Sequence, residues 1–231
     1  MSKNEAELLD WYKVIPKKFL TKSHNPFYHV HGLKVPFYGL LIGSSGAGKT
    51  QTLLNIMHNM KETFNNIYII TKNKNEPLYT WIEEKLGKDG LQVLEGINNA
   101  PDLDKLNKKE QTLIVFDDLV LEKNQEKIEE MFIRARKLNA SVIYISQDYY
   151  RVPTIVRHNL TYLFIKRLST LNDLYRIMRE YSTGVDKSQL KKMYDNATIE
   201  KKDFLLVDLE SDVKDRFRKN FNEIYDIEPE K

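Results

Sequence analysis

Residues 40–57, LLIGSSGAGKTQTLLNIM, pass from apolar residues through a cluster of glycines and serines into a helical pattern, with one lysine at the junction. Within them, residues 43–50 fit G-x-x-x-x-G-K-[ST] and lie between a predicted strand and a predicted helix. Small residues let successive backbone N–H groups turn inward around an anion, and the helix N-terminus adds partial positive charge. The stretch therefore predicts a phosphate-binding loop.

The junction lysine, Lys49, is then the cation that reaches the β- and γ-phosphates of ATP, and the Thr50 hydroxyl is a predicted Mg²⁺ ligand. The alternative is a glycine-rich turn with a solvated lysine, which the flanking strand and helix disfavour. The predicted nucleotide-binding residues are Gly43, Ser44, Ser45, Gly46, Ala47, Gly48, Lys49, Thr50 and Gln51.

Composition narrows the class of protein. The chain has 231 residues, 41% of them hydrophobic, and we expect one domain with appendages. It contains no run of about 18 apolar residues and no secretory leader, so we expect a cytosolic protein without a membrane span. Zero cysteines exclude disulfides and thiolate zinc sites. With 36 basic and 33 acidic residues, any nucleic-acid contact must come from local clustering.

Strand-like and helix-like segments alternate along the chain. Apolar strands are expected at 66–70, 91–96, 112–118, 141–146 and 160–166, with helices at 50–60, 77–87 and 122–138 between them. Before the phosphate loop we expect a short helix ending near Pro16 and a hairpin around His31 and Gly32; after residue 167 we expect helices, a late strand at 203–209 and a charged tail. Strands that are apolar throughout indicate an α/β fold with a mostly parallel sheet covered on both faces.

The segment TLIVFDDL, residues 112–119, has the form of a Walker B strand. Asp117 is predicted to hold Mg²⁺ through water, and Asp118 to polarise the attacking water. An acidic turn at the end of a strand is the alternative. Because a further strand–helix unit separates this segment from the phosphate loop, we expect an extra strand between the two in the sheet, as in motor-type ATPases. Gln147, at the tip of the next strand, is a candidate γ-phosphate sensor, with a strand-end cap as the alternative.

Four segments in order, GSSGAGKT, LIVFDD, RKLNASVIYISQ and VPTIVRHN, resemble the FtsK–HerA superfamily, most closely the genome-packaging ATPases of poxviruses, giant DNA viruses and virophages. The resemblance spans about residues 35–167. It implies a RecA-like ATPase that forms a pentameric or hexameric ring and moves double-stranded DNA into a capsid. It also implies contact with capsid proteins, and location in the host cytoplasm, the viral factory or the virion. We divide the chain into an N-terminal extension (1–34), an ATPase core (35–167) and a C-terminal part (168–231).

By the same likeness Arg136 corresponds to an arginine finger, Gln147 to the family's sensor, and Arg157 and Asn159 to downstream polar positions. A finger from a neighbouring subunit would stabilise charge on the transferred phosphoryl group. A solvated helix residue is the alternative for Arg136. Many relatives carry glutamate where this chain has Asp118, so Glu122 is a second candidate for orienting water.

The remaining features have simpler interpretations. A metal site at His24, His29 and His31 is disfavoured because no carboxylates accompany them. Trp11 and Trp81 are interpreted as packing residues, and a DNA contact through Lys72 and Lys74 as a minor alternative to a solvated surface. Residues 214–221, KDRFRKNF, fit a subunit contact, a DNA-binding face or a solvated helix. The alternative function is a P-loop switch ATPase that binds a protein partner without moving along DNA; a nucleotide kinase is weaker, since no lid with paired arginines is evident.

Overall fold

The computed structural model describes residues 8–20, 22–87, 89–181 and 184–227. Among these residues, nine strands form one sheet in the order β3-β2-β4-β5-β1-β6-β7-β8-β9. The first six in that order are mutually parallel, and the last three are antiparallel additions. The strands are β1 (Tyr38–Ile42), β2 (Asn66–Thr71), β3 (Leu91–Glu95), β4 (Thr112–Asp117), β5 (Ala140–Ser146), β6 (Tyr162–Ile165), β7 (Leu205–Asp208), β8 (Phe217–Lys219) and β9 (Glu223–Ile224). The predicted α/β class with a mostly parallel sheet is confirmed.

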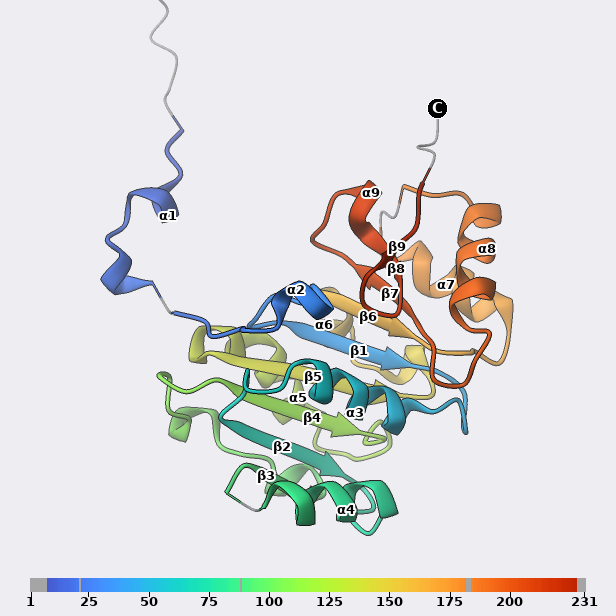
Figure 1. Cartoon of the computed structure of the whole chain (residues 1–231). Helices are drawn as coiled ribbons and strands as arrows, with labels where there is room; N and C mark the ends of the chain where they lie inside the picture. The colour runs from blue at the N-terminus through green and yellow to red at the C-terminus, as the bar shows by residue number, and fades with distance from the viewer. Residues whose placement is uncertain (1–7, 21, 88, 182–183, 228–231) are drawn as a thin grey trace, which may run out of the picture.

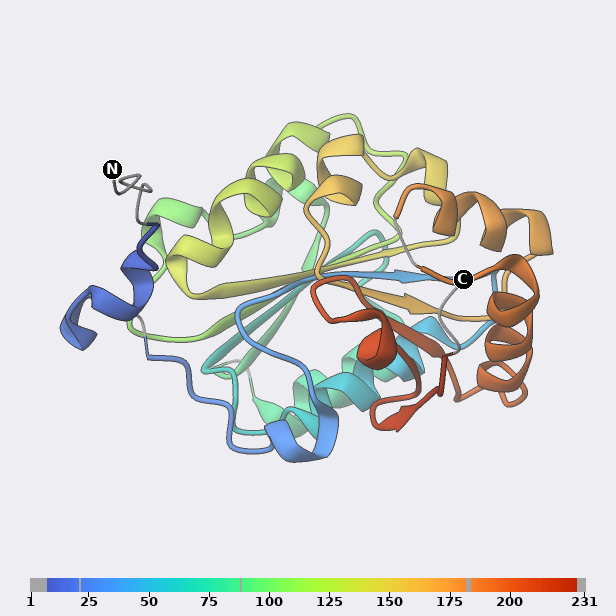
Figure 2. The same ribbon diagram turned by 90° about the horizontal axis from the view of Figure 1, so that it is seen from above.

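Helices cover both faces of this sheet (Figures 1 and 2). Helices α3 and α4 lie on one face and α5 and α6 on the other, and each face buries its own apolar core. The α-helices are α1 (Trp11–Val14), α2 (Tyr28–His31), α3 (Lys49–Asn59), α4 (Pro77–Leu86), α5 (Gln125–Arg134), α6 (Thr154–His158), α7 (Leu171–Arg179), α8 (Lys187–Ala197) and α9 (Val213–Arg216). Short 3₁₀ turns are η1 (Lys17–Phe19), η2 (Ile97–Asn99), η3 (Leu103–Lys105), η4 (Ala135–Leu138) and η5 (Tyr149–Arg151).

The central strands are buried along their whole length because helices cover them on both sides. Strand β5 lies between β1 and β4, so the expected extra strand between the phosphate loop and the Walker B strand is confirmed. The strand in that position follows both motifs in the sequence. The unit β2-α4-β3, which separates the motifs along the chain, lies beyond β4 instead.

The predicted hairpin around His31 and Gly32 is wrong. Residues 28–31 form helix α2, which ends at Gly32, where φ is 63° and the backbone N–H donates to the Tyr28 carbonyl at 2.7 Å. The physical reason is that β1 has parallel neighbours on both sides, β5 and β6, so no edge is open to a preceding strand.

A solvated helix, one of the three interpretations of residues 214–221, is wrong for most of this stretch. Residues 217–219 form β8, in which Phe217 is fully buried and Arg218 pairs with Asp208 at 3.1 Å. Of the segment 214–221, only its start, in α9, is helical.

Residues 8–20, which we call the arm, stand away from the sheet in both views (Figures 1 and 2). Every residue of the arm is exposed, and Trp11 is 68% exposed. Trp81, on α4, is 51% exposed. Neither tryptophan is therefore the packing residue that the sequence predicts. None of the helices in the described parts of the chain combines the length and apolar character needed to cross a bilayer.

Candidate nucleotide-binding site

A cavity of about 640 Å³ lies at the carboxyl ends of β1, β2, β4 and β5. It brings together most of the residues that the motifs predict: Ser45, Gly46, Gly48, Lys49, Thr50, Gln51, Asp117, Asp118 and Gln147. A second hollow of about 260 Å³, on the other side of the phosphate loop, is lined by Ser44 and Ala47 together with Ser45 and Gly46. Parallel strands end at the same edge of the sheet, which is why motifs that lie about 70 to 100 residues apart converge here.

The phosphate loop needs glycine at two positions for different reasons. Gly48 has φ of 86°, and a Cβ atom there would lie 2.8 Å from the Lys201 carbonyl oxygen. A Cβ atom on Gly43 would lie 2.5 Å from the Cβ of Lys166. Backbone and side chains from the C-terminal half of the chain therefore press against the loop, and only glycine fits at these contacts.

Lys49 begins helix α3 and folds back over the loop. Its Nζ donates to the carbonyl oxygens of Gly43 at 2.9 Å and Ser44 at 3.0 Å. Burial lowers the pKa of Lys49, and the nearby carboxylates of Asp117 and Asp118 raise it in opposition. The lysine is thus a partly desolvated cation held beside two acidic groups, which suits it to meet an anionic ligand.

Asp117 is buried at the end of β4, and its Oδ2 accepts a 2.7 Å hydrogen bond from the Tyr79 hydroxyl. Burial raises the pKa of Asp117 to about 6, while the bond from Tyr79 opposes that rise. Tyr79 lies on α4 and is itself fully buried, which raises the pKa of its phenol. No local pattern points to this partner, because the two residues are 38 positions apart and the sequence of α4 is that of an ordinary amphipathic helix.

Asp118 occupies the left-handed region, with φ of 56°, and its backbone N–H donates to the Ile145 carbonyl at 3.2 Å. This turn sends its exposed side chain toward Gln147, whose amide donates to Oδ1 at 3.4 Å. Glu122 is engaged elsewhere: its Oε2 accepts from the Ile97 backbone N–H at 3.1 Å. Glu122 is not among the residues that line the cavity.

Arg136 lies at the amino ends of the parallel strands, on the side of the sheet opposite to the cavity. It sits in η4, just before β5 begins at Ala140, whereas the cavity lies past the other end of that strand. Seven strand residues at about 3.3 Å each place the two edges roughly 20 Å apart. The guanidinium stacks over Tyr38 at 4.6 Å, pairs with Glu210 at 3.2 Å and donates to the Thr161 hydroxyl. Arg136 therefore does not reach the cavity of its own chain.

Arg157 and Asn159 also lie outside the residues that line the cavity. Arg157 forms a partly exposed ion pair with Glu180, so it ties α6 to the end of α7. The Asn159 side chain donates to the Ile155 carbonyl at 2.8 Å at the end of α6.

A clamp of residues that the motifs did not predict holds the phosphate loop from behind. The Arg167 carbonyl accepts from the Ser44 N–H at 2.9 Å and from the Ser44 hydroxyl at 3.0 Å. Lys166 is buried, and its Nζ donates to the carbonyl oxygens of Lys201 at 2.8 Å and Asp203 at 2.6 Å. Burial lowers the pKa of Lys166 to about 8. The only signal in the sequence is a lysine that directly follows an apolar strand.

The loop held by this clamp reaches the cavity, because Lys201 lines both hollows. Lys72, which follows β2, lines the larger cavity as well, and Lys74 is exposed nearby in the same loop. The cavity thus has three lysines, Lys49, Lys72 and Lys201, of which the motifs predict one as a phosphate ligand.

The histidines have separate roles. His31 is fully buried, its Nδ1 accepts from the Leu33 N–H at 3.0 Å, and its Nε2 lies 3.1 Å from the Asn25 side-chain oxygen. Burial, with a smaller contribution from His29, lowers the pKa of His31 to about 4. The backbone of His24 is bound at both N–H and C=O by the Gln111 side chain. His31 is therefore a packed, neutral histidine.

Comparison with known proteins agrees with this geometry. Residues 24–212 match the family described as "Poxvirus A32 protein". The "DNA packaging protein OPG160" of variola virus is 29% identical over 160 residues, which cover 64% of this chain and 58% of the relative. The "Uncharacterized protein L649" of Acanthamoeba polyphaga mimivirus is 23% identical over 184 residues, which cover 79% of this chain and 57% of the relative. The chain thus spans somewhat over half the length of the curated relatives it matches.

Solved structures share the fold. The genome packaging NTPase B204 of Sulfolobus turreted icosahedral virus 2, in complex with ATP-gammaS, has a TM-score of 0.58 at 16% identity, and the match covers 81% of this chain and 98% of that one. The ATPases 2 and 3 of EssC from Geobacillus thermodenitrificans give 0.54 at 10% identity, over 82% and 39% of the two chains. The expected RecA-like P-loop fold is confirmed, and so is the resemblance to poxvirus packaging proteins. With its matched region covering most of the chain, this protein belongs to the poxvirus A32 protein family.

Proposed function

We propose that this chain is an ATPase that acts as an oligomeric ring and moves double-stranded viral DNA into a capsid. The observation that carries the proposal is the convergence of Lys49, Asp117, Asp118 and Gln147 on one cavity, in a chain whose relatives are named DNA packaging proteins. From that function we infer that the protein acts in the host cytoplasm or the viral factory. Capsid proteins would be its partners, and the virion would be a further location.

Each side chain at the cavity has a chemical task in this proposal. Lys49 leaves its carbonyl partners and binds the β- and γ-phosphates of ATP, while backbone N–H groups of the loop surround them. Asp118 accepts a proton from a water molecule as the water oxygen attacks the γ-phosphorus. The bond from that phosphorus to the bridging oxygen then breaks, giving ADP and phosphate. Gln147, bonded to Asp118, orients the water or reports the γ-phosphate.

The residues at the cavity also fit Mg²⁺, which prefers oxygen ligands and retains several waters. The Thr50 hydroxyl and the Asp117 carboxylate supply such oxygens at the same cavity, and Tyr79 fixes the orientation of that carboxylate. Bound Mg²⁺ would neutralise part of the charge that develops on the transferred phosphoryl group.

The position of Arg136 supports a ring. Because this residue lies at the far edge of the sheet from its own cavity, it can stabilise a phosphoryl group only in a neighbouring subunit. To do so it must leave Glu210 and Thr161, so we expect these contacts to break when the neighbour binds ATP.

ATP turnover measured with and without duplex DNA tests the function. A translocase should hydrolyse ATP faster with DNA and assemble on it, whereas a switch ATPase that binds a protein partner should do neither. The folded Lys49→Ala protein is the control for contaminating activity. DNA-independent turnover by a monomer would contradict the proposal and favour the switch.

A further inference from the structure

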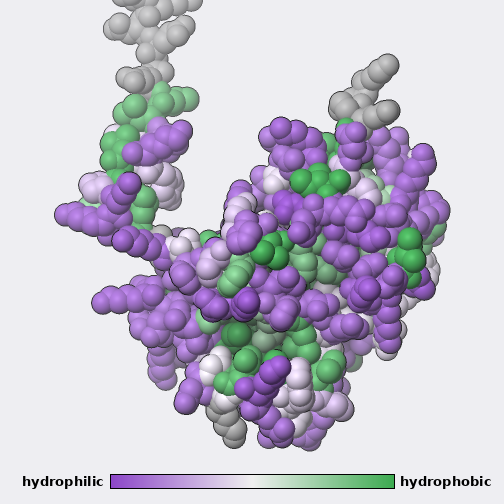
Figure 3. Space-filling model, in the orientation of Figure 1, coloured by the Kyte–Doolittle hydropathy of each residue, from purple (hydrophilic) through white to green (hydrophobic). Residues whose placement is uncertain are grey.

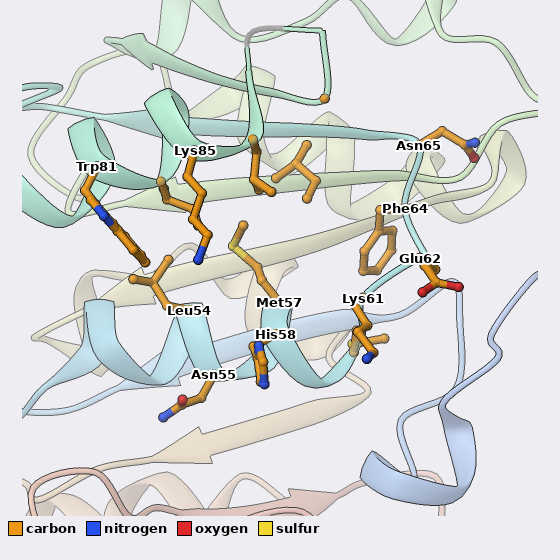
Figure 4. A pocket seen from close by; sticks show the side chains of 15 residues that line it. Leu54, Asn55, Met57, His58, Lys61, Glu62, Phe64, Asn65, Trp81 and Lys85 are labelled. Atoms are coloured by element: carbon orange, nitrogen blue, oxygen red, sulfur yellow. The ribbon is translucent and has the colours of Figure 1, made fainter.

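An apolar groove of about 480 Å³ lies between helices α3 and α4, on the face of the molecule away from α5 (Figure 4). Its floor and walls include Leu54, Met57, Phe64, Ile67, Trp81 and Ile82. Hydrophobic residues gather at this place on the surface (Figure 3). The groove is separate from the cavity that holds Lys49, since the two share no lining residue.

The arm carries a matching set of unpacked apolar side chains. Leu8 is 95% exposed, Trp11 68% and Tyr12 81%, and Leu9 and Ile15 are also exposed. The polar contacts of the arm that the structure describes are internal, such as the pair of Lys13 with Asp10 at 3.2 Å. A short segment with this much exposed apolar surface, next to an open apolar groove on the same chain, marks both as parts of an interface.

The match between the two surfaces is apolar rather than electrostatic. Lys61, Lys85 and His58 line the groove together with the carboxylate of Glu62. Within residues 8–15 of the arm, Asp10 and Lys13 pair with each other at 3.2 Å, so this segment carries no net charge. Its apolar side chains can therefore enter the groove without burying an unpaired charge.

The root of the arm is fixed in a way that favours a second copy. The backbone N–H and C=O of His24 are both bound by the Gln111 side chain, which also donates to the Thr63 carbonyl at 2.7 Å. From this anchor the arm leaves the body on a course away from the groove of its own chain (Figure 1). An arm on this course presents its apolar side chains to a second molecule rather than to the groove of its own chain.

We propose that residues 8–15 of one copy bind in the α3–α4 groove of a second copy, with Trp11 as the main apolar anchor. Such an exchange is head-to-tail, because the arm and the groove are different surfaces, and head-to-tail contacts close into a ring when the rotation allows. The interaction requires neither ATP nor DNA. It therefore stands or falls separately from the proposed ATPase activity.

Disulfide trapping tests the exchange directly, because the chain contains no cysteine. Full-length Leu9→Cys protein is mixed with full-length Asn55→Cys protein under mild oxidation, without nucleotide; Asn55 lines the groove. We expect a disulfide-linked dimer of the two variants. The matched control replaces Asn55→Cys with Ile133→Cys, a residue of α5 that is 55% exposed on the other face, and should give little dimer.

Two results would overturn the proposal. One is an equal dimer yield with the Ile133→Cys control, and the other is a Leu9→Cys, Asn55→Cys double variant that links only within its own chain.

A second measurement uses the two tryptophans. In Trp81→Phe protein, Trp11 is the only tryptophan. Its emission, excited at a wavelength that tyrosine does not absorb, should shift to shorter wavelength as concentration rises. Trp11→Ser should weaken self-association about tenfold or more, as expected for an aromatic anchor. Unchanged emission and unchanged association would refute the role of the arm.

Discussion

Replacing Lys166 with methionine removes the cation that holds the loop of Lys201 and Asp203 against the phosphate loop. Methionine has a similar length and can fill the buried space, so the change tests the two hydrogen bonds and the charge rather than packing. The two bonds, at 2.8 and 2.6 Å, end on carbonyl oxygens that the variant leaves without this donor.

Two opposing energies decide the effect on stability. Two hydrogen bonds from a neutral amine stabilise the folded chain by about 1–3 kcal/mol in total. Burial lowers the pKa of Lys166 from 10.5 to about 8. Keeping the amine protonated in the folded chain therefore costs roughly 3 kcal/mol at pH 7.5. The cost of keeping the buried amine protonated matches or exceeds the stabilisation from its two hydrogen bonds. Lys166→Met should therefore be as stable as the unmodified chain at pH 7.5, or slightly more stable.

The difference in stability between the unmodified chain and Lys166→Met changes with pH. Between pH 8 and 10.5 the unfolded chain binds more protons at this residue than the folded chain, so stability rises with pH. The penalty falls from roughly 3 kcal/mol at pH 7.5 to roughly 1 kcal/mol at pH 9.5. Relative to Lys166→Met, the unmodified chain should thus gain about 2 kcal/mol over this range, because other titrating groups cancel in the comparison.

Urea unfolding of both proteins at pH 7.5 and 9.5 measures this difference. A stability difference that does not change with pH would refute the buried, protonated lysine. ATP hydrolysis should respond differently. Without the clamp the phosphate loop is held less firmly, so the KM for ATP should rise about tenfold. The kcat should fall less, since the phosphate loop positions the phosphates but does not activate the attacking water. Lys202→Met, an exposed lysine of the same loop, is the matched control and should change neither. A normal KM in Lys166→Met would contradict the clamp.

Two proposed catalytic residues, Asp118 and Arg136, and the buried His31 give three further predictions. Asp118→Asn should still bind ATP with Mg²⁺ but hydrolyse it roughly 10²-fold more slowly, as expected for loss of a general base; if Glu122→Gln shows this loss in its place, the base is Glu122. Arg136→Ala should bind ATP yet turn it over on the order of 10³-fold more slowly, and mixing it with Lys49→Ala should restore part of the activity; mixed rings that stay inactive would exclude a finger acting between subunits. Burial lowers the pKa of His31 to about 4, so the unfolded chain binds more protons between pH 6.5 and 4 and stability is lost as pH falls. From pH 7.5 to 5 the chain should lose about 2 kcal/mol more than His31→Asn in urea unfolding, and equal losses would mean that His31 titrates normally.

The phosphate loop and the Walker B strand could be predicted from the sequence because their chemistry is local. Consecutive small residues before a helix form an anion site from their own backbone, and an apolar strand ending in Asp117 and Asp118 places both at the edge of a parallel sheet. Gln147 followed by the same rule, from the end of β5. The α/β class followed from strands that are apolar throughout.

The order of the strands and the partners around the loop are decided only by the tertiary structure. Tyr79 meets Asp117 across 38 residues, and the Arg167 carbonyl meets Ser44 across 123, so no local pattern contains either pair. The predicted hairpin is wrong because β1 pairs with strands on both sides, and no pattern in the segment before β1 indicates this pairing. Arg136 shows the same limit: its sequence position suggests a catalytic arginine, but only the direction of β5 places it at the edge away from its own phosphate loop. Local backbone chemistry depends on neighbours in the chain, whereas pairing, burial and reach depend on residues that folding alone brings together.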